Sequence, residues 1–127
     1  CFVLVMALGC VIGFFGTTNS LIEPIISLSV IVFGVLFLVP RFLTFTATLI
    51  TVALFALVHG YAHGKDMPIF VLPEIYIAGF MISTIAIHIA GVGIGELIHK
   101  LPKARRITQV TGGLLIIAGT ALLINAV

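Results

Sequence analysis

Charged side chains are scarce in this sequence. Among its 127 residues only 6 are Lys or Arg and 4 are Asp or Glu, and Trp is absent. Soluble domains carry about 25% charged residues, whereas this chain has 8% charged and 61% hydrophobic residues, with a mean hydropathy of +1.39. This composition excludes an ordinary soluble domain and, because no basic stripe occurs, a nucleic-acid partner. We therefore expect an integral membrane protein whose surroundings are the lipid bilayer.

The sequence also lacks the motifs of common enzymes. It contains no Gly-rich phosphate loop, no serine elbow and no Cys-x-x-Cys pair. Its two cysteines, Cys1 and Cys10, lie on one apolar stretch and would be about 13 Å apart along a helix, which is too far for a disulfide. We expect neither an enzyme nor a bound organic cofactor.

Long apolar runs, interrupted by Pro, Gly and charged residues, dominate what is present. They predict an all-α fold: a polytopic transmembrane helical bundle with five crossings, forming a single domain over residues 1–127. The apolar piece 69–72 is too short to span and is predicted to be an interfacial or re-entrant connector. Because the first run starts without a charged flank, we expect a sixth crossing upstream in the full-length protein. The predicted helices are 1–15, 21–39, 42–62, 75–98 and 107–127.

Basic residues in the short loops predict the orientation of the bundle. Cytoplasmic loops carry the excess of Lys and Arg, and five of the six basic residues fall in the loops 40–41 and 99–106. These loops are therefore predicted to be cytoplasmic. The loop from His63 to Asp66 would then lie on the periplasmic, lumenal or external side, together with Glu23.

His59 and His63 are the leading candidates for a metal site. They are four residues apart at the outer end of the third run, so they share one helix face. Neutral imidazole is a good ligand for nickel, cobalt, copper or zinc. Gly60 and Gly64 let other backbone approach closely, and Asp66 lies just beyond. The alternative is a pair of amphipathic residues at the membrane interface.

Glu23 and His88 are further candidate ligands. The Glu23 carboxylate could complete an imidazole and oxygen site at the same membrane face, or it could simply partner the helix dipole. His88 lies about 20 Å below the outer end of the fourth run, near mid-membrane, where an ionisable residue is costly unless it faces a partner or water. We therefore predict a second, deeper binding position for the ion at His88. A His hydrogen-bonded to a neighbouring helix is the alternative.

The segment 55–68, FALVHGYAHGKDMP, closely resembles the HupE/UreJ family of hydrogenase and urease accessory proteins, which are membrane permeases for nickel or cobalt. The run His-Gly-x-Ala-His-Gly-x-acidic-Met-Pro is specific. Two other stretches are also similar to that family: Glu23-Pro24 leading into Ser29 and Gly34, and His88 followed by Gly91 and Gly95.

Two departures from the family pattern stand out. Asp66 occupies a position where the family usually has Glu, which keeps the charge but shortens the side chain. The family also has an earlier helix with a His-Pro-x-x-Gly-x-Asp-His motif, and this motif does not occur here. We expect those residues either upstream of Cys1 or lost from this chain.

The resemblance implies a permease with Ni²⁺ or Co²⁺ as the transported substrate, while the residues alone indicate an imidazole-preferring divalent ion. His59, His63 and Asp66 would form the outer capture site. A different class of hypothesis is a non-transporting subunit of a larger membrane complex, or a homo-oligomer, in which His88 binds a pigment or haem. A metal-dependent membrane hydrolase is a weaker third option, because no general base lies beside the histidines.

Overall fold

The computed structural model describes residues 2–17, 20–39 and 44–127. These residues contain helices and connecting turns but no strand, which confirms the predicted all-α class. The predicted loop 40–41, which carries Arg41, and the predicted helix end at Cys1 lie outside the described residues. Five helices are described: α1 (Phe2–Phe15), α2 (Ile22–Leu38), α3 (Phe45–Lys65), α4 (Pro73–His99) and α5 (Ala104–Ala126).

Local chemistry explains where these helices begin. Thr44 caps α3, because its side-chain oxygen accepts a hydrogen bond from the Ala47 amide at 3.2 Å. Pro73 opens α4, where its missing N–H costs nothing and Glu74 meets the positive end of the helix dipole. The apolar connector 69–72 is not helical and is exposed.

The third helix ends later than predicted. It continues to Lys65, so His63 lies in its last turn instead of in a loop. The helix ends at Asp66, whose amide still donates to the Ala62 carbonyl at 3.0 Å. Polar side chains do not interrupt backbone hydrogen bonding, so the helix continues through the polar residues 63–65.

Three of the helices are long and apolar enough to cross a membrane: α3, α4 and α5. The described parts of α1 and α2 have 14 and 17 residues, which at 1.5 Å per residue gives about 21 and 26 Å against a hydrocarbon core of about 30 Å. Most large apolar side chains are exposed, as expected for a surface that faces lipid. Crossing of the membrane by α1 and α2 stays a prediction.

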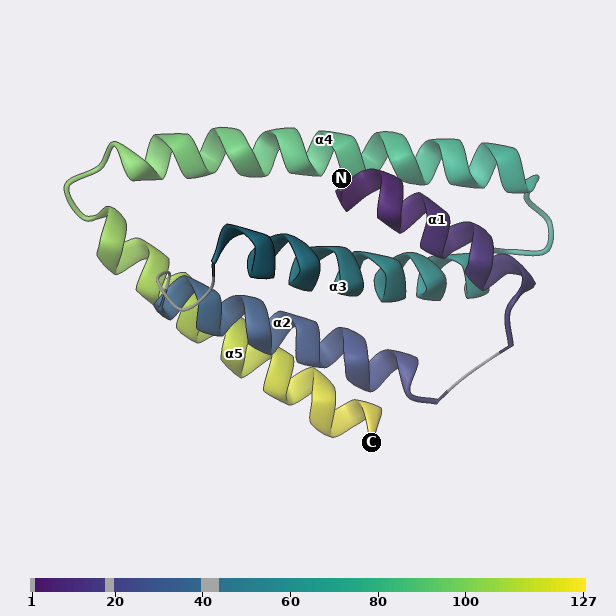
Figure 1. Cartoon of the computed structure of the whole chain (residues 1–127), viewed down its shortest axis with the longest axis horizontal. Coiled ribbons are helices and arrows are strands. Elements are labelled where there is room, and N and C mark those ends of the chain that lie inside the picture. The colour runs from purple at the N-terminus through teal and green to yellow at the C-terminus, as the bar shows by residue number, and fades with distance from the viewer. Residues whose placement is uncertain (1, 18–19, 40–43) are drawn as a thin grey trace.

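The helices pack mainly as two pairs. Helix α1 lies against α3, and α2 lies against α5, while α2 and α3 join the pairs (Figure 1). Glycines allow both close contacts. A Cβ on Gly34 would come within 2.8 Å of the Gly112 carbonyl oxygen, and a Cβ on Gly119 would come within 2.9 Å of the Ile31 amide nitrogen. Small residues thus let the backbones of α2 and α5 approach directly.

Helix α4 is less covered by the rest of the chain. It runs along one side of the molecule and touches α1 and α5 (Figure 1). Every residue from Ile85 to Leu97 is exposed. The N-terminal half of α4, which begins beside the end of α3, is the part that helps to form the candidate site.

Candidate functional site

His59 and His63 lie side by side on α3, as their spacing predicts. Their ring centroids are 5.0 Å apart, with the ring planes inclined by 59°. Both residues are partly buried. Two imidazoles at this separation can turn toward one ion or one water cluster, because residues four apart on a helix are neighbours on its surface.

The glycines that follow each histidine determine which way the pair faces. A Cβ on Gly60 would come within 2.8 Å of the Met6 carbonyl carbon, and one on Gly64 within 2.9 Å of the Phe14 amide nitrogen. Gly60 and Gly64 therefore form the surface of α3 that packs on α1. Each His is one residue, or about 100°, away from its glycine, so the histidines lie beside the contact with α1 and not within it.

The first turns of α4 supply the other wall of the site. The Tyr76 hydroxyl donates a hydrogen bond to the His63 carbonyl oxygen at 3.1 Å. The Phe80 ring lies 4.6 Å from the His63 ring, centroid to centroid. Sequence reasoning missed both aromatic residues, although their four-residue spacing at the start of a helix puts them on one face.

Asp66 and Glu23 are not gathered with the histidines into one cluster. Asp66 is exposed at the end of α3, and Glu23 is exposed in the first turn of α2. In residues 2–17, 20–39 and 44–127, no group of three or more His, Cys, Asp or Glu side chains could hold a metal ion. Of the four residues predicted at this face, the described residues thus bring His59 and His63 together.

His88 lies apart from this pair, on the exposed half of α4. Its Nδ1 is 2.8 Å from the Thr84 carbonyl oxygen, one turn earlier, and its ring is 4.4 Å from the Phe2 ring. A ring nitrogen facing a carbonyl carries the proton, which leaves Nε2 as the free acceptor. A Cβ added at the nearby Gly91 or Gly95 would meet no atom of a neighbouring element within 4 Å among the described residues.

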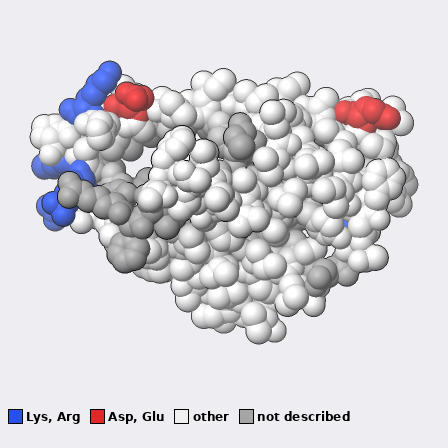
Figure 2. Space-filling model, viewed as in Figure 1, with Lys and Arg blue, Asp and Glu red and all other residues white. Residues whose placement is uncertain are grey.

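The opposite ends of the bundle differ in charge. On the face drawn in Figure 2, Lys and Arg gather at the end where α4 finishes, and acidic side chains lie at both ends. Four basic residues occur within the seven positions 100–106. The histidine pair lies at the other end, where α3 finishes and α4 begins.

Comparison with known proteins identifies relatives. A family model described as HupE / UreJ protein matches residues 1–122. Among curated proteins, "Protein HupE" of Rhizobium leguminosarum bv. viciae is 35% identical over 125 residues, which cover 98% of this chain and 64% of that protein. The chain thus spans less than two thirds of the length of this relative. No solved structure matches this chain significantly.

Proposed function

This chain belongs to the HupE/UreJ family, and from that premise we propose that it is part of a membrane permease for a divalent transition metal, nickel or cobalt, and not an enzyme. The observation that carries the proposal is the pair His59 and His63, 5.0 Å apart at one end of a membrane-spanning helix. An imidazole pair favours borderline metals over Mg²⁺ or Ca²⁺, which prefer oxygen ligands.

An incomplete ligand set suits transport. Structural metal sites are closed by four protein ligands, whereas conduction requires binding weak enough for release. Two imidazoles leave positions for water, for the neighbouring Asp66 carboxylate or for ligands elsewhere in the protein. In the proposed orientation the pair faces the periplasm, lumen or exterior, and Glu23 raises the local concentration of cations on that side.

His88 is the proposed second binding position for the ion. It is the sixteenth residue of α4, so it lies about 22 Å along the helix axis from the end that carries Tyr76. The His63 ring contacts Phe80, which lies eight residues, or about 12 Å along α4, before His88, so one ion cannot contact both imidazoles at once. An ion leaving the outer pair would meet the free Nε2 of His88 next, on the part of α4 that this chain leaves uncovered.

Metal uptake by cells tests the outer site. We expect His59→Ala combined with His63→Ala to lower nickel or cobalt uptake about tenfold or more, since both nitrogen ligands are lost. His99→Ala is the matched control, because it removes an imidazole from the opposite end of α4. Membrane levels of the full-length protein are measured in parallel. Unchanged uptake by the double variant at normal levels would overturn the proposed site.

A second candidate function is a non-transporting subunit of a larger membrane assembly. The exposed stretch Ile85–Leu97 favours it, because a helix with a Gly-rich face can accept another helix or a flat macrocycle. Purification of the native protein distinguishes the two functions. Normal metal uptake by His59→Ala/His63→Ala cells, together with an absorbance band that is lost in His88→Ala, would favour the subunit.

A further inference from the structure

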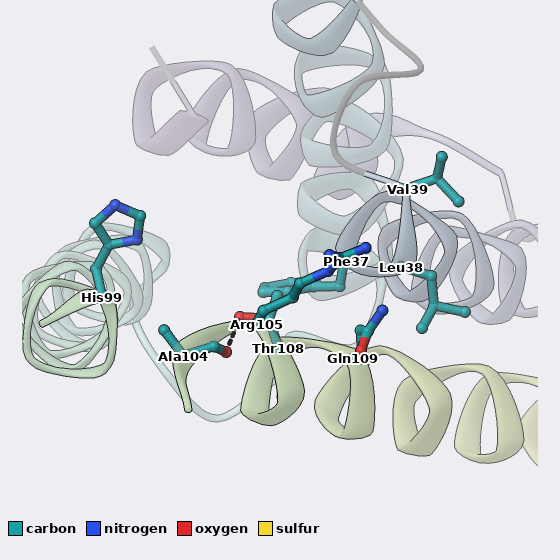
Figure 3. Close-up of a pocket in the computed structure, with 8 residues that line it drawn as sticks. All are labelled: Phe37, Leu38, Val39, His99, Ala104, Arg105, Thr108 and Gln109. Carbon is teal, nitrogen blue, oxygen red and sulfur yellow. Dashed lines mark hydrogen bonds between the residues drawn. The ribbon is translucent and has the colours of Figure 1, made fainter. Parts of the chain in front are cut away.

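A cavity of about 750 Å³ lies at the end of the bundle opposite the histidine pair. Its size falls within the range of about 300–1,000 Å³ that is typical of ligand pockets. One wall is apolar and comes from the end of α2, with Phe37, Leu38 and Val39. Facing it, the first turns of α5 present polar side chains, as Figure 3 shows for Arg105 and Gln109.

The polar wall carries one basic side chain, Arg105, beside Thr108 and Gln109. Arg105 belongs to the run Lys100, Lys103, Arg105 and Arg106, and no acidic residue occurs between positions 97 and 106. Arg105 is exposed, and within the part of the chain described no carboxylate forms an ion pair with it. Its guanidinium therefore keeps hydrogen-bond donors for a ligand, in the planar arrangement that suits a phosphate.

The start of α5 adds to this positive charge. Lys103 occupies the N-cap position without a side-chain capping hydrogen bond, and Ala104 lines the cavity. The positive end of the helix dipole thus lies on the same side as the Arg105 side chain. Both features favour an anion at this place.

The cavity lies at the depth of lipid headgroups. Helix α4 has 27 residues, which is about 40 Å and equals the thickness of a bilayer with its headgroup layers. The turn after α4 therefore reaches the membrane surface. Phe37, Leu38 and Val39 are 45%, 36% and 40% exposed, so the apolar wall is open to an acyl chain beside the polar wall.

We propose that this cavity binds one anionic phospholipid, with the headgroup phosphate on Arg105 and an acyl chain along Phe37. The combination of the two walls carries the assignment. A free phosphate would use the polar wall and leave the apolar wall exposed, and a zwitterionic lipid would bring a second cation, its choline group, to a site that is already positively charged. The proposal is independent of the metal site, which lies at the other end of α4.

Lipid retention by the full-length protein tests the proposal. The protein is purified in detergent, loaded with equal amounts of phosphatidylglycerol and phosphatidylcholine, and examined by native mass spectrometry. We expect preferential retention of phosphatidylglycerol. A basic residue near a membrane surface contributes the equivalent of about a fivefold change in affinity for anionic lipid, so Arg105→Gln should lower this retention about fivefold, and Arg105→Lys should preserve most of it.

Arg106→Gln is the matched control, because it removes the same charge from the same turn but does not line the cavity. Its retention of phosphatidylglycerol should fall less than twofold. Equal losses in both Gln variants would show a diffuse surface charge and overturn the proposal, as would unchanged retention in Arg105→Gln. Displacement of the lipid by millimolar inorganic phosphate at constant ionic strength would identify a free-phosphate site and overturn the assignment to lipid. Circular dichroism checks that each variant folds.

Discussion

Tyr76 is the residue that ties α4 to the histidine pair. Its hydroxyl donates to the His63 carbonyl oxygen at 3.1 Å, which orients the last turn of α3 without occupying the imidazole nitrogens. We expect Tyr76→Phe to raise the nickel concentration at half-maximal uptake by about twofold to fivefold, since a hydrogen bond contributes about 1 kcal/mol. Concentration-dependent uptake by cells measures this change.

Tyr61→Phe is the matched control for Tyr76→Phe. The Tyr61 hydroxyl donates to the Thr17 carbonyl oxygen at 2.6 Å, so its removal costs a similar hydrogen bond on the same helix as the histidines but on the side of the α1–α2 connection. The half-saturating concentration should stay unchanged in this variant. Equal shifts in both variants would mean that Tyr76 acts through stability alone.

Contacts between residues of one helix could be predicted from the sequence. Contacts that depend on the register of two helices could not. The meeting of His59 and His63 follows from their spacing. The contact of Phe80 with His63 depends on how far α4 slides along α3, and no local pattern fixes that distance. The same limit explains why Glu23, which belongs to α2, is not found beside the pair. Asp66 belongs to the end of α3, where its side chain is exposed.

At the scale of elements, the glycines of α3 hold α1 in place, and their removal should be costly. A Cβ on Gly60 would come within 2.8 Å and 3.0 Å of two Met6 backbone carbons. Backbone atoms cannot move aside cheaply, so we expect Gly60→Ala to destabilise the protein by about 1–3 kcal/mol. Thermal unfolding of the full-length protein in detergent measures the loss.

Gly93→Ala provides the comparison on α4. Nothing described lies within 4 Å of a Cβ at Gly93, and Ala is about 1 kcal/mol more favourable than Gly inside a helix. Its unfolding temperature should stay equal or rise. A decrease as large as that of Gly60→Ala would show that another segment or subunit packs on this face of α4, and would contradict its exposure here.

The helical elements were largely predictable because an apolar segment in a membrane must satisfy its backbone hydrogen bonds internally and therefore forms a helix. The residues at which the helices begin and end were less predictable. Lys65 and Ala104 belong to helices although the polarity of 63–65 and 104–106 indicated loops. At a membrane surface water satisfies charged side chains, so hydropathy locates the lipid boundary, while the backbone continues until a residue such as Pro68 or Pro102 ends it.

At the scale of the whole molecule, charge separates the two ends of α4, and this separation predicts the topology. The basic turn 100–106 should be cytoplasmic, and Asp66 should lie on the other side. In a full-length variant with Cys1→Ser and Cys10→Ala, a membrane-impermeant thiol reagent applied to intact cells should label Asp66→Cys at once. Lys103→Cys should react only after permeabilisation.

The reverse pattern would invert the orientation and place the histidine pair on the cytoplasmic side, where it would release metal and not capture it. Labelling of both positions from one side would contradict a single crossing by α4.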